Sequence, residues 1–281
     1  MNYLLIHILF STVFGLVIKE GQRRKVRLMP LGMVNYIVAG AWYALECASQ
    51  GWPEVSSGVA GTGIFGGVAY IVSYFFLVGC MDFQGISVPS TVLRLSQLVP
   101  VLYAILCWGE SPSPWQGAGL AVFCAAIVLL MPGDPRKMRQ QQNSREFVLL
   151  AGLFFVTGFC GVATKRFSSI APTEMRGVFL MFLFGTTGVI ALAALLLRKE
   201  MPNRTELVLG ILLGTCNVVG NNYIVLALEV LGGLIVFPAS SAAAILVTAV
   251  LAVLIWKEKL SRKAWIGIVL SSLSVILINL K

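Results

Sequence analysis

The sequence predicts an all-α integral membrane protein with ten transmembrane helices, arranged as two inverted five-helix repeats. Its composition, its ten apolar segments and a set of motifs that occurs twice carry this prediction. Hydrophobic residues make up 58% of the 281 residues, charged residues make up only 12%, and the mean hydropathy is +0.87. Because about a quarter of the residues in a soluble domain are charged, this chain lacks the polar residues that a fold in water needs.

The ten apolar segments follow one another with short connections between them. A helix needs about 20 residues to cross a bilayer, and inside the bilayer it must pair its own backbone N–H and C=O groups. Each segment is therefore expected to form one spanning helix. In chain order the segments cover residues 2–18, 29–49, 58–79, 86–107, 114–131, 147–164, 177–197, 206–228, 233–256 and 264–280.

Several motifs recur about 148 residues further along the chain. The matching pairs are Trp108 and Trp256, Glu110 and Glu258, Gly63 and Gly210, and Gly67 and Gly214. We read the two glutamates as structural turn residues and the glycine pairs as positions of close helix packing. Because the offset is half the chain, residues 1–131 are expected to form the first repeat and residues 147–281 the second, joined by a basic cytoplasmic linker at 132–146.

The distribution of Lys and Arg orients the predicted helices. Of the 21 basic residues, 16 lie in the odd-numbered connections, and only Lys165, Arg166 and Arg176 lie in the even-numbered ones. Basic residues accumulate on the cytoplasmic side of a membrane, so both termini are expected on the non-cytoplasmic side of the cell membrane. Five spans are an odd number, so the second repeat must be inverted relative to the first.

The recurring hairpins resemble those of a known family. They are similar to the fourth-to-fifth and ninth-to-tenth helix hairpins of EamA-like proteins, which belong to the drug/metabolite transporter superfamily. The residues that carry the resemblance are Pro100, Trp108, Glu110 and Gly117 in the first half, and Trp256, Glu258 and Gly267 in the second. The resemblance implies a ten-helix carrier with a central cavity between its halves that works by alternating access, and it leaves the substrate open.

Arg94 is the charged residue that the sequence places deepest in a predicted span. An ionised side chain that faces lipid there costs at least about 2.5 kcal/mol, so Arg94 should face a cavity or a partner such as Asp82 or a helix C-terminus. Ser90 and Gln97 fall on the same helical face as Arg94. We expect these three side chains to line the pathway and bind substrate.

Other polar side chains inside the spans are further candidates, each with a structural alternative. The asparagines of the eighth segment either line the cavity or lock helices together. Tyrosines of the third segment suit ring-shaped or sugar substrates, although aromatic packing is also consistent with them, and hydroxyls of the ninth segment often serve packing alone. The complete set of candidate substrate-binding residues is Arg94, Gln97, Ser90, Tyr70, Tyr74, Asn217, Asn221, Asn222 and Ser241.

Glu46, near the outer end of the second segment, is the candidate coupling residue for H⁺ or Na⁺, or else an interfacial anchor. No cofactor or metal site is expected, because the chain has a single His and no CxxC pair. An enzyme is not expected either, since Glu46 is the one carboxylate well inside a predicted span.

The sequence therefore predicts a secondary transporter of a small organic metabolite, whether an amino acid, an organic acid, a sugar or a drug-like compound. Its partners would be this small-molecule substrate, the lipid bilayer, and H⁺ or Na⁺. The net charge of +9 lies in short connections between apolar runs, which favours a membrane surface over nucleic acid. The alternative is a channel or a membrane assembly subunit that transports nothing.

Overall fold

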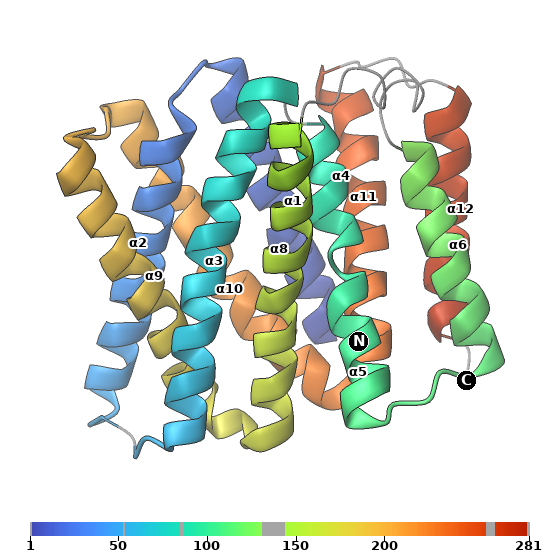
Figure 1. Cartoon of the computed structure of the whole chain (residues 1–281), viewed down its shortest axis with the longest axis horizontal. Coiled ribbons are helices and arrows are strands. Elements are labelled where there is room, and N and C mark those ends of the chain that lie inside the picture. Colours follow the sequence, from blue (N-terminus) through green and yellow to red (C-terminus); the bar gives the residue numbers. More distant parts are fainter. Residues whose placement is uncertain (1, 53, 85–86, 131–143, 257–261, 280–281) are drawn as a thin grey trace. The chain divides into compact units, whose positions relative to one another are not determined.

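The computed structural model describes residues 2–52, 54–84, 87–130, 144–256 and 262–279, and all regular elements in these ranges are helical (Figure 1). They are α1 (Asn2–Arg23), α2 (Leu28–Ser49), α3 (Ser57–Gln84), α4 (Ser87–Leu95), α5 (Leu98–Trp108), α6 (Pro114–Leu130), α8 (Ser144–Ile170), the 3₁₀ turn η1 (Thr173–Met175), α9 (Arg176–Arg198), α10 (Arg204–Leu231), α11 (Gly233–Trp256) and α12 (Arg262–Asn279).

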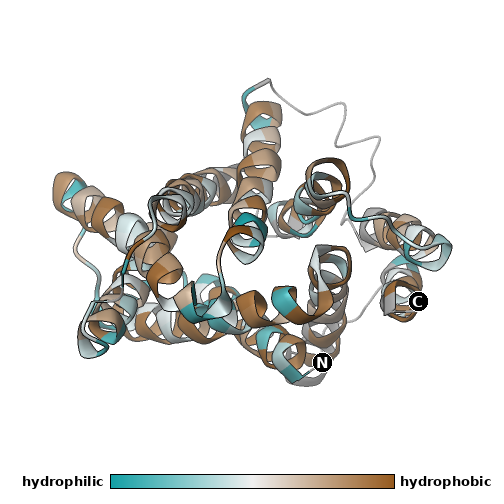
Figure 2. Cartoon of the chain, turned by 90° about the horizontal axis from the view of Figure 1, so that it is seen from below, coloured by the Kyte–Doolittle hydropathy of each residue, from teal (hydrophilic) through white to brown (hydrophobic). Residues whose placement is uncertain are grey.

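Seven stretches of the described chain are long and apolar enough to cross a membrane. They lie in α1, α2, α3, α4–α5, α8, η1–α9 and α10. Shorter apolar stretches occupy Gly233–Ala244 of α11 and Trp265–Ile278 of α12, and α6 has 17 residues. Hydrophobic residues recur along the helices (Figure 2). The prediction of an all-helical, multi-pass membrane protein is confirmed, whereas the number of ten spans stays a prediction.

Several predicted segments differ from the observed helices, and α1 and α3 end at Arg23 and Gln84, five residues beyond their predicted ends. The fourth segment, residues 86–107, is not one continuous helix, because α4 ends at Leu95 and α5 begins at Leu98. The sixth segment was predicted to end at residue 164, but α8 continues to Ile170, which places Lys165 and Arg166 inside the helix. Arg166 is exposed, whereas Lys165 is buried within the helix despite its charge, so composition alone set that boundary too early.

The described residues group into two compact units. Unit 1 contains residues 1–74 and 162–231, and unit 2 contains residues 75–161 and 232–281. Each unit therefore combines helices from both halves of the sequence. The long helices α3 and α8 contribute to both units, because the division falls inside each of them.

In unit 1, α2 and α9 cross with their backbones in close contact. A Cβ atom added at Gly40 would lie 2.6 Å from the carbonyl oxygen of Phe184. A Cβ atom added at Gly188 would lie 3.1 Å from the carbonyl oxygen of Tyr36. The residue further along α2 thus meets the residue that comes earlier in α9, so the two helices run antiparallel.

The two recurring glycine pairs make the same contact twice within unit 1. An added Cβ at Gly63 of α3 would lie 2.6 Å from Cβ of Phe182 in α9. An added Cβ at Gly210 of α10 would lie 2.6 Å from Cβ of Val34 in α2. The second glycine of each pair continues the contact, with Gly67 against Thr186 and Gly214 against Val38. The interpretation of these glycines as close-packing positions is confirmed, because any larger side chain would overlap the neighbouring helix.

In unit 2, α6 and α12 pack side by side (Figure 1). Gly119 allows this contact, since an added Cβ would lie 2.7 Å from Cγ1 of Ile278. The start of α11 is held by Glu110, whose carboxylate accepts a hydrogen bond of 3.3 Å from the backbone N–H of Leu234. A carboxylate at a helix N-terminus is favourable, so Glu110 has the structural role that the sequence predicts. Its counterpart Glu258 lies outside the described residues.

Candidate functional site

The helix break in unit 2 separates two of the predicted substrate-binding residues. Arg94 lies in the last turn of α4, and Gln97 is the residue before α5. Both side chains are half-buried. The helix is interrupted between them, although Gln97 still bonds back to the carbonyl of Arg94 over 3.3 Å, and their shared role in binding stays a prediction. The side chain of Ser90, the third member of the predicted stripe, lies outside the described residues, as does that of Asp82.

Pro100 accounts for the position of this break. Proline has no N–H group and so cannot donate to the carbonyl four residues earlier, which here belongs to Ser96. The Ser96 carbonyl instead accepts a bond of 3.0 Å from the N–H of Val99. The proline ring packs on α8, where a Cβ added at Gly161 would lie 2.7 Å from its Cγ. The break thus results from the N–H group that Pro100 lacks and from the close contact of its ring with α8.

Apolar packing fixes the two sides of the break. Leu95, which ends α4, and Leu98, which begins α5, both pack against a buried cluster of Phe123 from α6 and Ala242 from α11. Ser241, another predicted binding residue, precedes Ala242 and is itself buried. The structure therefore brings the α4–α5 break and this part of α11 into one region of unit 2.

A chain of hydrogen bonds joins the amides of unit 1 across three helices. Tyr70 of α3 donates to Oδ1 of Asn221 over 2.8 Å. Asn221 donates to Oδ1 of Asn217 over 3.0 Å, and Asn217 donates to Oδ1 of Asn35 in α2 over 2.9 Å. The Nδ2 group of Asn35 ends the chain without a hydrogen-bond partner among the described residues. In this conformation the asparagines act as the interhelical lock that was the structural alternative, and Asn35 is a member that the sequence did not single out.

Tyr74, one turn after Tyr70, faces α2 instead. Its hydroxyl donates to the carbonyl of Leu28, at the start of that helix. Its ring fills the space beside Gly32, where no larger residue would fit, and it meets the ring of Tyr36 edge-on at 5.6 Å. Tyr74 is buried, so its contacts here are those of a packed aromatic residue.

Asn222 and Glu46 lie near the start of α9. Asn222 accepts a hydrogen bond of 2.9 Å from Nε of Arg176, the first residue of α9. Oε1 of Glu46 lies 3.7 Å from the position of a Cβ added at Gly177. The Tyr43 hydroxyl, three residues before Glu46, donates to the carbonyl of Val218 over 2.7 Å. Arg176 therefore belongs to a polar group at the helix end, not to a connection as its place in the sequence suggested.

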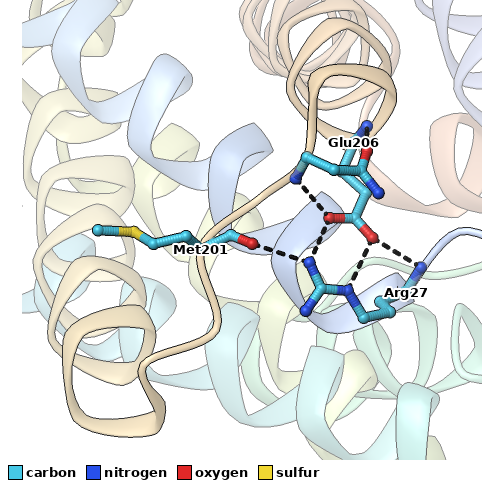
Figure 3. A network of polar contacts seen from close by, with 4 residues as sticks. Arg27, Met201 and Glu206 are labelled. Carbon is cyan, nitrogen blue, oxygen red and sulfur yellow. Dashed lines mark hydrogen bonds and ion pairs between the residues drawn. The ribbon is translucent and has the colours of Figure 1, made fainter.

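A separate polar network lies at the start of α10 (Figure 3). Arg27 donates to Glu206 from its backbone N–H and Nε over 3.0 Å each, and from Nη2 over 2.8 Å. Nη2 also donates to the carbonyl of Met201. Asn203 accepts from the N–H of Glu206 and donates its own N–H to the carboxylate, which is a capping box in form. This network was not predicted from the sequence, because Arg27 lies 179 residues before Glu206.

The predicted site residues thus fall into two groups. Unit 1 holds Tyr70, Tyr74, Asn217, Asn221, Asn222 and Glu46, and unit 2 holds Ser90, Arg94, Gln97 and Ser241. Within the described residues, no three His, Cys, Asp or Glu side chains come together as a metal site would require.

Two known proteins are similar to this chain over nearly its whole length. A curated protein of Haemophilus influenzae, described as an "Uncharacterized protein", is 22% identical over 279 residues, with 96% of this chain and 95% of that protein covered. A solved structure described as "Crystal structure of protein" matches with a TM-score of 0.73 and 17% identity, covering 99% of this chain and 95% of the other. This second likeness shows a shared fold.

The family model described as "EamA-like transporter family" matches residues 145–280. This family comprises membrane transporters of the drug/metabolite superfamily, not enzymes. The match confirms the resemblance predicted from the sequence: residues 145–280 of this chain are similar to the EamA-like transporter family.

Proposed function

We propose that the protein is a secondary transporter that moves a small organic metabolite across the cell membrane by alternating access. Its ten spans would form two inverted repeats, residues 1–131 and 147–281, with both termini on the non-cytoplasmic side. The substrate would be an amino acid, an organic acid, a sugar or a drug-like compound, and H⁺ or Na⁺ would be the coupling ion.

The reciprocal contact of α2 and α9 is the observation that carries this proposal. Gly40 meets Phe184 while Gly188 meets Tyr36, and the two α9 residues follow their α2 counterparts Tyr36 and Gly40 by 148 positions. Reciprocal contacts of this kind are the mark of a two-fold axis. A two-fold axis that relates two antiparallel helices runs across them, so for spanning helices it would lie in the membrane plane. Inverted repeats related by such an axis are typical of secondary transporters.

The broken span supports a binding role for Arg94. Substrate sites of transporters are commonly built at discontinuous helices near the middle of the membrane. The break between α4 and α5 lies within the candidate span Thr91–Trp108. Arg94, at the end of α4, would engage an anionic or carbonyl group of the substrate, with Gln97 beside it.

A ligand screen followed by transport assays tests this proposal. A ligand that binds only the folded protein raises its melting temperature with concentration, so purified protein would be screened against amino acids, organic acids, sugars and drug-like compounds. The stabilising compound would then be assayed for uptake into proteoliposomes. No uptake of any stabilising compound would count against a transporter.

Arg94 variants test the site. Lysine keeps the charge but loses the planar fork that binds a carboxylate through two contacts. Arg94→Ala and Arg94→Lys should therefore both lower uptake of a carboxylate substrate, by about tenfold or more for a lost charge-assisted hydrogen bond. Arg198→Ala, at an exposed position, is the control. Normal uptake by a folded Arg94→Ala protein would show that Arg94 is only a packed residue.

A further inference from the structure

Arg176 has more hydrogen-bond donors than its neighbours use. Nε donates to Asn222 over 2.9 Å, and Nη1 approaches the carbonyl of Thr173 at 3.4 Å. Both acceptors are neutral. In the part of the chain that the structure describes, no carboxylate lies within ion-pair distance of this guanidinium, and Nη2 takes part in neither contact.

The equivalent place in the first half shows that helix packing there does not need a charge. About 148 residues earlier than Arg176 and Asn222 stand Leu28 and Tyr74. These two residues are also bonded to each other, by the Tyr74 hydroxyl and the Leu28 carbonyl. That contact ties the two helices together with neutral groups alone. Since a neutral bond suffices in one copy, the guanidinium in the other copy calls for a different explanation.

Asn222 holds the guanidinium in a set direction. A hydrogen bond at Nε fixes one edge of the planar group and leaves the donors at its far end for another partner. Arg176 is half-buried and begins α9, where the positive end of the helix dipole favours a negative charge. An arginine fork and a helix start thus point to the same chemistry, which is that of a planar or tetrahedral oxyanion.

Glu46 is the charged side chain that faces this position from α2, as its contact with the added Cβ at Gly177 shows. The Glu46 carboxylate lies beyond ion-pair distance of the Arg176 guanidinium. Glu174, two residues before Arg176, is exposed. A ligand anion would therefore replace no existing ion pair on binding, although it would feel repulsion from Glu46.

We propose that Arg176, oriented by Asn222, is an oxyanion-binding residue of unit 1, which takes the carboxylate or phosphate group of a ligand. The ligand is either a soluble organic anion or the headgroup of an anionic phospholipid, since both present this chemistry at the end of a span. Arg176 belongs to unit 1 and Arg94 to unit 2, and oxyanion binding to Arg176 can be measured without knowledge of the transported compound.

The first experiment measures thermal stability of the purified full-length protein in detergent. Potassium phosphate or potassium acetate replaces potassium chloride at constant ionic strength, which removes general screening effects. The melting temperature of the parent protein should rise and saturate with the oxyanion. Arg176→Gln should abolish the rise, whereas Arg166→Gln, which removes an exposed arginine from α8, should retain it. Glu46→Gln should move the rise to lower anion concentration.

The second experiment separates a soluble anion from a lipid. The same proteins are placed in nanodiscs of phosphatidylcholine, with or without phosphatidylglycerol. Stabilisation by phosphate or acetate in detergent identifies a soluble anion, whereas stabilisation only by phosphatidylglycerol identifies a headgroup, and in each case Arg176 must be required. The proposal is overturned if the parent protein responds in neither arm, or if Arg176→Gln responds as the parent does.

Arg176→Lys keeps the test decisive should the glutamine variant fail to fold. It preserves the charge at the start of α9 but cannot keep both the Asn222 bond and a two-pronged contact with the ligand. The half-saturating anion concentration should rise by about tenfold, the effect of one lost charge-assisted bond. An unchanged value would overturn the proposal.

Discussion

Glu206 is a fully buried carboxylate, and its partners explain why that is tolerated. A charge removed from water is costly unless it is paired and hydrogen-bonded. Here the side chain is 0% exposed and is bonded to Arg27, which is 51% exposed, at 2.8 Å. The hydrogen bond to Glu206 also raises the pKa of Arg27, so the guanidinium stays charged at every pH at which a protein is handled. The pair joins the α1–α2 turn to the start of α10.

Loss of Arg27 should therefore destabilise the protein. In Arg27→Gln the buried carboxylate keeps its bonds to backbone N–H groups but loses its counter-charge, so the melting temperature should fall by several degrees. Arg24→Gln is the matched control, because it breaks only an exposed pair with Glu20 in the same segment, and exposed pairs contribute little. Equal melting temperatures for the two variants would contradict this account.

A site contact could be predicted from the sequence where both residues lie on the same face of one helix, and not where the partner lies in another helix. Asn217 and Asn221 stand four residues apart, so the sequence shows that they are neighbours, and the structure bonds them. Asn35 was missed because its partner Asn217 lies in another helix and no polar residue stands three or four positions from Asn35 in α2. Arg176 was missed because charge counting assigned it to a connection, and nothing in the spacing indicates its bond to Asn222.

At the scale of elements, small residues decide which helices approach. Gly63 lets α3 meet α9, since an added Cβ would lie 2.6 Å from Cβ of Phe182 and 2.9 Å from the carbonyl of Phe179. The sequence signal was sufficient to predict close packing at this position. It could not name the partner helix, because a glycine pair describes only one of the two surfaces that meet.

Gly63→Ala should consequently force α3 and α9 apart. Overpacking of this kind costs about 1–3 kcal/mol, and the unfolding temperature should drop accordingly. Gly61→Ala offers a matched control in the same helix, because an added Cβ there has nothing within 4 Å; alanine should be neutral or slightly stabilising at that position, given its helix propensity. Thermal unfolding of both variants decides the matter, and an equal response would show that the close contact carries no energy.

The α4–α5 break shows where hydropathy misses a structural signal. The apolar run through residues 86–107 satisfies the length of a span, so it was predicted as one helix. Pro100 was noticed only as part of a motif, although its missing N–H weakens the helix at the carbonyl of Ser96. A proline acts four residues before its own position, which is where the structure places the interruption.

For the whole molecule, the duplicated motifs predicted two similar halves but not how their helices are shared out. Unit 1 takes α1, α2, α9 and α10, and unit 2 takes α4, α5, α6, α11 and α12. The assignment of helices to the two units depends on contacts between residues more than 100 positions apart. Local sequence patterns carry no information about such contacts. The proposed repeat predicts that residues 1–131 superpose on residues 147–281 by a two-fold rotation about an axis in the membrane plane, which an experimental structure would check.

The orientation in the membrane is the remaining prediction at this scale. The odd-numbered connections carry 16 of the 21 basic residues, and a bias of this size places them in the cytoplasm. Single cysteines at Arg24 and Glu54, both exposed, would report on the α1–α2 and α2–α3 connections in a background without the native cysteines. A membrane-impermeant maleimide added to intact cells should label Glu54→Cys but not Arg24→Cys, and both should react after the cells are opened. Labelling of Arg24→Cys alone in intact cells would reverse the proposed orientation and place both termini inside.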